Sequence, residues 1–131
     1  MTGVFMTPLA LAQACLQAYV DKNRAAVDAL LADDFCFTSP IDNAIDRDTY
    51  FARCWPNSEH MHAATVLRSA ENGDQAFVVY EAEIAGKRFR NCEMHTARNG
   101  KLMSVEVYFG WDLPHPAAPG QFINEGGKTR A

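Results

Sequence analysis

Glu93 and His95 are the residues whose types and spacing point most directly to chemistry. They lie two positions apart in a β-rich run, so a strand would place both side chains on one face, about 7 Å apart. A carboxylic acid beside an imidazole can serve as a general acid or base. The same pair can instead lock a hairpin as a structural ion pair. Both interpretations remain open at the level of sequence.

A β-hairpin predicts the face on which this pair lies. Segment 87–111 contains two strand-like runs joined at Arg98-Asn99-Gly100-Lys101, and Asn-Gly is a strong hairpin signal because both positions tolerate φ > 0. Alternation then predicts one face carrying Phe89, Asn91, Glu93, His95, Val105, Val107, Phe109 and Trp111. An acid and an imidazole among apolar and aromatic side chains indicate a lined cavity.

Tyr80 and three histidines are further candidates. Tyr80 shares the parity of the apolar face of its strand, so its hydroxyl could donate to a substrate carbonyl, or simply bond to backbone inside the core. His60 and His62 lie on one face, but no H-E-x-x-H spacing accompanies them. We therefore expect no metal site and no cofactor.

Composition indicates one ordinary globular domain. The 131 residues are 48% hydrophobic and 21% charged, with a formal net charge of −4, and no basic stripe indicates a nucleic-acid partner. No apolar run approaches the roughly 20 residues needed to cross a bilayer. The four cysteines show no C-x-x-C pair, as expected for buried free thiols in a reducing compartment. We expect a cytoplasmic protein that binds neither membrane nor nucleic acid.

Turn and cap signals predict the order of elements. Thr7-Pro8 opens a first helix that ends before 21–23, and a shorter helix follows around Ala26–Leu31. We expect a strand at 35–39, a loop at 41–44, a helix at 47–54, strands at 60–69 and 75–84, and then the hairpin. Segment 113–131 is rich in Pro and Gly, and predicts an extended tail partly packed through Phe122 and Ile123, with a disordered end.

This order predicts an α+β domain over 1–112. The expected architecture is a cone-shaped, curved antiparallel β-sheet, with three helices from the N-terminal half packed on its concave face. The tail at 113–131 would lie outside that domain.

The chain resembles the nuclear transport factor 2-like superfamily, and within it the SnoaL-like and ketosteroid-isomerase group. The similarity covers roughly residues 7–112. It rests on the order of elements, on Ala32-Asp33-Asp34-Phe35, on the 98–101 hairpin and on Val107-Tyr108-Phe109-Gly110-Trp111. The superfamily holds isomerases, polyketide cyclases, dehydratases, epoxide hydrolases and non-catalytic binding or assembly domains, so the resemblance implies the fold more strongly than the activity.

The resemblance also implies which residues could act. Ketosteroid isomerases place a base Asp before the proline that closes the first strand, and Ser39 stands there in this chain. Cys15 occupies the position of their oxyanion tyrosine, while Glu93 matches their second, protonated acid. Cysteine is a poor donor and Ser39 has no base of its own, so we do not expect steroid isomerisation. Asp42, in the loop at the expected mouth, is the nearest aspartate.

Two functions fit these observations. The first is a cofactor-free enzyme that isomerises, cyclises or dehydrates a small apolar carbonyl compound, with Glu93, His95 and Tyr80 as catalytic residues. The alternative is a non-catalytic binding or assembly module. The expected ligand-binding residues are Cys15, Tyr19, Phe37, Ser39, Asp42, Trp55, Val107, Phe109 and Trp111.

The opposite face of the sheet predicts a homodimer. Alternation places apolar and polar side chains together on this outer face, which no predicted helix covers. Its members are Phe77, Val79, Arg90, Cys92, Met94 and Tyr108.

Overall fold

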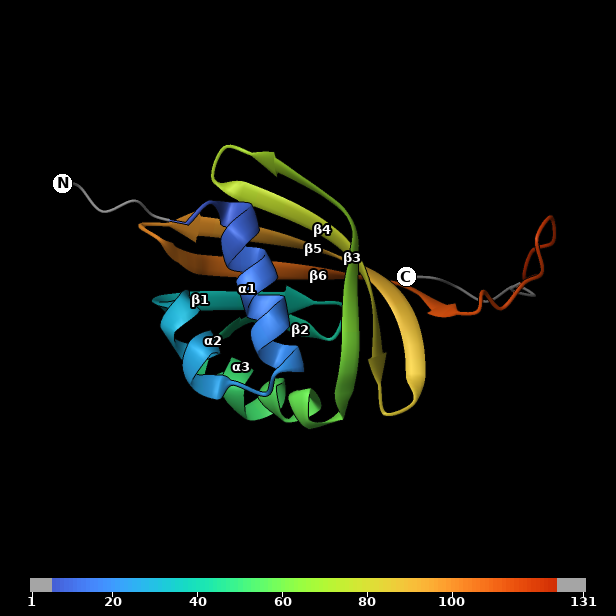
Figure 1. Ribbon diagram of the computed structural model, residues 1–131, viewed down its shortest axis with the longest axis horizontal. Coiled ribbons are helices and arrows are strands. Elements are labelled where there is room, and N and C mark those ends of the chain that lie inside the picture. The colour runs from blue at the N-terminus through green and yellow to red at the C-terminus, as the bar shows by residue number, and fades with distance from the viewer. Residues whose placement is uncertain (1–5, 125–131) are drawn as a thin grey trace.

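A computed structural model describes residues 6–124 as one curved sheet with helices on one face (Figure 1). The elements are α1 (Pro8–Val20), α2 (Arg24–Leu30), β1 (Leu31–Ser39), β2 (Asp42–Asp46), α3 (Arg47–Arg53), the 3₁₀ helix η1 (Trp55–His60), β3 (Met61–Asn72), β4 (Gln75–Ile84), β5 (Lys87–Arg98) and β6 (Lys101–Leu113). The sheet has six strands in the order β2-β1-β6-β5-β4-β3. The predicted α+β cone with helices on its concave face is confirmed.

Helices α1, α2 and α3 each begin at a side-chain cap that the sequence supplies. The Thr7 hydroxyl accepts a hydrogen bond from the Ala10 amide, and Pro8 occupies the first turn of α1. Asn23 caps α2, and Asp46 caps α3 by accepting from Thr49. Helix α1 crosses the sheet and contacts strands β3 to β6, so it covers the hollow side of the sheet (Figure 1).

The N-terminal half differs from the prediction in two places. Segment 41–44, predicted as a loop, belongs to β2, because Asp42–Asp46 turns back and pairs with β1. Strand β1 begins at Leu31 rather than at residue 35, since Leu31 pairs with Leu102 of β6. That β1–β6 pairing is parallel, whereas every other neighbouring pair of strands in the described sheet is antiparallel.

Tight turns join strands β3 to β6, and the turn predicted at 98–101 is present. Asn99 and Gly100 both have positive φ values between β5 and β6, and Ala85 and Gly86 do the same between β4 and β5. Gly73 opens the turn after β3. These short connections fix the register along β3 to β6, and so decide which side chains enter the hollow.

A β-bulge at Gly110 shifts the alternation near the end of β6. Asn91 pairs with Phe109 while Arg90 pairs with Trp111, so Gly110 is the extra residue. A Cβ on Gly110 would lie 2.0 Å from the Arg90 carbonyl oxygen, which explains why this position is glycine. The bulge therefore interrupts the regular alternation predicted for this strand between Phe109 and Trp111, although both residues still line the hollow side of the sheet. Its ring lies 5.5 Å from the Arg90 guanidinium and 5.9 Å from the His115 ring.

The segment after β6 forms no helix or strand within 114–124. The predicted packing through Phe122 and Ile123 was wrong, because these side chains are 83% and 56% exposed. The predicted disorder at the end of the tail lies outside the described residues. No helix in the described part of the chain is long and apolar enough to cross a membrane.

Replacing Gly110 with Ala should destabilise the fold by about 1–3 kcal/mol, because the new methyl group must displace the β5 backbone. Chemical denaturation followed by circular dichroism measures the change. Gly73→Ala is the comparison: nothing lies within 4 Å of its Cβ position, so only its positive φ strains the new residue, at a cost of about 1 kcal/mol. A Gly110→Ala variant as stable as wild type would contradict the tight approach at the bulge.

Candidate functional site

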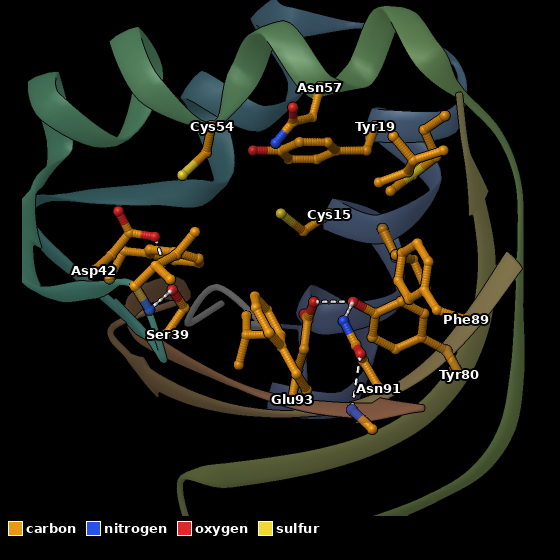
Figure 2. A pocket seen from close by; sticks show the side chains of 18 of the residues that line it. Cys15, Tyr19, Ser39, Asp42, Cys54, Asn57, Tyr80, Phe89, Asn91 and Glu93 are labelled. Atoms are coloured by element: carbon orange, nitrogen blue, oxygen red, sulfur yellow. Dashed lines mark hydrogen bonds between the residues drawn. The ribbon is translucent and has the colours of Figure 1, made fainter. Parts of the chain in front are cut away.

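A cavity of about 460 Å³ opens between the hollow side of the sheet and the helices (Figure 2). Its walls come from α1, α3, η1 and strands β1 to β6, so distant parts of the sequence meet in it. Most lining side chains are apolar or aromatic, and a few polar groups converge among them. This mixture is typical of sites for small organic molecules.

Glu93 is the central polar group of this cavity. The Tyr80 hydroxyl donates to Glu93 Oε2 at 2.7 Å, and His95 Nε2 lies 2.8 Å from Oε1. The Glu93 side chain is 16% exposed and that of His95 only 3%, so the carboxyl group faces the cavity while the imidazole lies behind it. Within residues 6–124, no arginine, lysine or backbone amide bonds to this carboxyl group. Each carboxylate oxygen therefore keeps acceptor capacity for a ligand.

The tautomer of His95 follows from its surroundings. Nδ1 is buried and has no hydrogen-bond partner among the described residues. A buried N–H without an acceptor is rarer and costlier than an unused acceptor, so we assign the proton to Nε2. His95 then donates to the Glu93 carboxylate, and a proton bound at Nδ1 would be left without an acceptor.

A chain of hydrogen bonds joins Glu93 to the bulge in β6. The Asn91 amide donates to the Tyr80 oxygen at 3.4 Å, and the Gly110 amide donates to Asn91 Oδ1 at 3.1 Å. Burial, followed by the charge of Glu93, holds the pKa of Tyr80 well above its usual range, so the phenol keeps its proton. That proton is directed at Glu93 in this structure, rather than at the cavity.

Across the cavity, Tyr19 supplies a second donor site. Its hydroxyl forms a short hydrogen bond with the Tyr50 hydroxyl of α3. One of the two phenols donates to the other, which leaves one phenolic proton for a ligand oxygen. Burial is the main cause that raises the pKa of both groups, so both stay protonated. Figure 2 shows Tyr19 and Asn57 on the wall opposite Glu93 and Tyr80.

Asp42 lies at another side of the cavity and is already paired. Figure 2 shows Ser39 beside Asp42, and Ser39 donates its hydroxyl to Asp42 Oδ2 at 2.7 Å. The Arg53 guanidinium bonds to Oδ1. The hydrogen bond from Arg53 is the main cause that lowers the pKa of Asp42. Asp42 is thus an ionised, charge-matched carboxylate, whereas Glu93 has no permanent positive partner among the described residues.

The cavity brings together most of the residues predicted from sequence. Its lining includes Glu93, His95, Tyr80, Cys15, Tyr19, Phe37, Ser39, Asp42, Val107, Phe109 and Trp111. Trp55 does not line it. Its ring packs edge-on against Tyr19, with the ring centroids 5.0 Å apart. His60 and His62 are exposed, and no three His, Cys, Asp or Glu side chains in the described chain are grouped to hold a metal ion.

Sequence reasoning missed four lining residues with polar or flexible side chains: Tyr50, Asn57, Met61 and Asp112. Tyr50 lies in the helix predicted at 47–54, and nothing in the sequence marks its bond to Tyr19. Asp112 enters the lining because the bulge at Gly110 puts it opposite Phe89 of β5. A glycine between two aromatic residues near a strand end was the available signal.

Comparison with known proteins places this geometry in a family. A family model described as the SnoaL-like domain matches residues 12–105. The chain belongs to the SnoaL-like domain family. No match appears among curated proteins.

Solved structures share this SnoaL-like fold at low sequence identity. An NTF2-like protein of unknown function from Cytophaga hutchinsonii has a TM-score of 0.72 at 20% identity, covering 84% of this chain and 95% of that one. An LEH-like epoxide hydrolase of M. tuberculosis has a TM-score of 0.64 at 19% identity, covering 76% and 80%. A Catenulispora acidiphila protein with a ketosteroid isomerase-like fold, in complex with trimethylamine, has a TM-score of 0.63 at 17% identity, covering 80% and 88%. These likenesses show the fold.

Two cysteines in the cavity lining give a test of the site's environment. Burial raises the pKa of Cys15 to about 12 and that of Cys54 to about 11. Because only the thiolate reacts, Cys54 should be alkylated by iodoacetamide about a hundredfold more slowly at pH 8 than an exposed thiol with the ordinary pKa of 9.0, and Cys15 more slowly still. The Cys54 rate should keep rising toward pH 11.

Mass spectrometry of tryptic peptides measures each rate separately, with the protein unfolded in urea as the control. Rapid modification of Cys15 or Cys54 in the folded protein near neutral pH would contradict the burial of these thiols.

Proposed function

We propose that this SnoaL-like protein is a cofactor-free enzyme that moves a proton on a small, largely apolar carbonyl compound. An isomerase, a cyclase and a dehydratase all belong to this class. The observation that supports it is the environment of Glu93. This carboxyl group faces an apolar cavity, two neutral side chains hold it, and no described arginine or backbone donor occupies its remaining lone pairs.

The geometry supports defined roles for the neighbours of Glu93. Glu93 takes a proton from the carbon next to the carbonyl, while His95 and Tyr80 hold its carboxylate in place through the 2.8 Å and 2.7 Å contacts. Negative charge develops on the carbonyl oxygen, and the free proton of the Tyr19–Tyr50 pair is the donor that can receive it. Isomerisation returns the proton to another carbon, and dehydration gives it to the departing hydroxyl group.

Hydrogen exchange at carbon tests this proposal without knowledge of the natural substrate. In D₂O, wild-type protein should accelerate deuterium uptake at the α-carbons of 2-tetralone, a small ketone, as followed by proton NMR. Glu93→Gln should lower that acceleration by about a hundredfold or more, because the amide cannot accept the proton.

Glu106→Gln is the matched control. Glu106 also accepts a hydrogen bond from a tyrosine hydroxyl, that of Tyr108, but it does not line the cavity. Wild-type exchange no faster than buffer, or a Glu93→Gln variant as active as wild type, would contradict the catalytic assignment.

The second candidate is a non-catalytic module that binds the same class of molecule. Ser39 and Cys15, at the positions where ketosteroid isomerases carry their base and oxyanion tyrosine, favour it, as does the pairing of Asp42 with Arg53. Binding of 2-tetralone by calorimetry, without any acceleration of exchange, would support this alternative.

We also propose that the protein is a homodimer through its outer sheet face. Within the described chain, the helices lie on the hollow side of the sheet, and no helix covers the opposite face (Figure 1). A two-fold axis would bury this face against its own copy. Its members include Val79, Met94 and Tyr108, whose side chain is 53% exposed.

Light scattering should therefore give twice the 14.5 kDa mass of one chain. Met94→Glu should shift the protein toward the monomer, since it places a charge in the apolar part of the interface. Ile123→Glu, at an exposed apolar position of the segment after β6 and outside the sheet, is the control. A monomeric wild type would contradict the dimer.

A further inference from the structure

The charged side chains that line the cavity are acidic. None of the described residues that line the cavity is Lys or Arg, whereas Asp42, Glu93 and Asp112 each bring a carboxyl group. Arg53 matches Asp42. Glu93 is held by neutral groups, and no ion pair within residues 6–124 reaches Asp112. Two carboxyl groups thus face the cavity without a cation.

Asp112 lies with aromatic side chains at the outer end of the cavity. The bulge at Gly110 sets it opposite Phe89, a lining residue whose strand position has the same parity as Asn91 and Glu93. Phe109, just before the bulge, also lines the cavity and is 55% exposed. Asp112, Phe89 and Phe109 thus line the same cavity, and Asp112 is an exposed residue. A carboxylate and aromatic rings are the groups that bind organic ammonium ions, since the rings attract a cation and the carboxylate neutralises it.

We propose that the ligand of this cavity is an organic cation, with its ammonium group at Asp112 between the Phe89 and Phe109 rings. This inference rests on the proposed function, because it takes the same cavity as the substrate site and adds the charge of the substrate. Phe89 and Glu93 are four residues apart on β5, or about 13 Å along the strand. An elongated amine can therefore reach Asp112 with its ammonium group while its acidic carbon lies at Glu93.

The same charges disfavour an anionic ligand. A carboxylate or phosphate entering the cavity would meet the exposed carboxylate of Asp112 at the mouth and then Glu93 inside, where repulsion is screened less than in water. A neutral ligand would leave Glu93 and Asp112 as they are. A cation at Asp112 gains its attraction chiefly from that carboxylate, because Glu93 lies about 13 Å away along the strand, and it covers the exposed face of Phe109.

Three adamantane derivatives of the same shape test the sign of the charge. 1-Adamantanamine is a cation at pH 7, 1-adamantanol is neutral and 1-adamantanecarboxylate is an anion. In calorimetric titrations of the full-length protein, the amine should bind about tenfold more tightly than the alcohol, and the carboxylate should bind more weakly than both. Equal or tighter binding of the alcohol or the carboxylate, or no binding of the amine, would overturn the inference.

Asp112→Asn locates the ammonium site. The variant should bind the amine and the alcohol with affinities within about twofold of each other, while its affinity for the alcohol stays at the wild-type value. Asp33→Asn removes the same charge from an exposed position of β1 that does not line the cavity, and should keep the tenfold preference. An Asp112→Asn variant that keeps the full preference would overturn the assignment of the ammonium group to Asp112.

These outcomes are separable from those of the exchange experiment. Loss of the cation preference together with intact Glu93-dependent deuterium exchange removes this inference and leaves the proposed function in place. A clear cation preference without exchange removes the catalytic proposal and supports a binding protein for amines.

Discussion

The proposed chemistry of this protein depends on a carboxylate that neutral groups hold in an apolar space. Glu93 is bonded by a phenol and an imidazole, and by no described arginine or lysine. Burying a carboxylate costs free energy unless hydrogen bonds or opposite charges compensate. Two charge-assisted hydrogen bonds meet part of that cost and leave the negative charge unneutralised. An unneutralised carboxylate in an apolar cavity interacts strongly with an acidic proton or a positive charge on a ligand.

Asp42 shows what the alternative looks like in the same cavity. Its two oxygens bond to Arg53 and Ser39, and the lowered pKa follows from the guanidinium. That carboxylate joins β2, which turns back along β1, to the end of α3. The different surroundings of the two carboxylates therefore give them different roles. Asp42 stabilises the wall of the cavity, while Glu93 is available to a ligand inside it.

The sequence predicted the sheet side of this site better than the helix side. Asn-Gly at 99–100 and the alternation along 87–98 predicted the inward positions of Asn91, Glu93 and His95. This was possible because the residues of a two-residue turn set the register of the strands next to it. The pairing of β1 with β6 and the bond between Tyr19 and Tyr50 join residues far apart in the chain. Those contacts depend on how α1 and α3 pack against the sheet. The periodicity of a single sequence does not predict this packing geometry.

The bulge at Gly110 links the geometry of the sheet to the candidate site. One extra residue in β6 interrupts the alternation between Phe109 and Trp111, brings Asp112 opposite Phe89, and points the Gly110 amide at Asn91. Asn91 bonds to Tyr80, and Tyr80 bonds to Glu93. The backbone position at the bulge therefore influences the position of the carboxylate through two side chains. A change at this glycine should therefore affect the chemistry of the cavity as well as the shape of the sheet. Alternation alone could not reveal this link, since a bulge is the place where alternation stops.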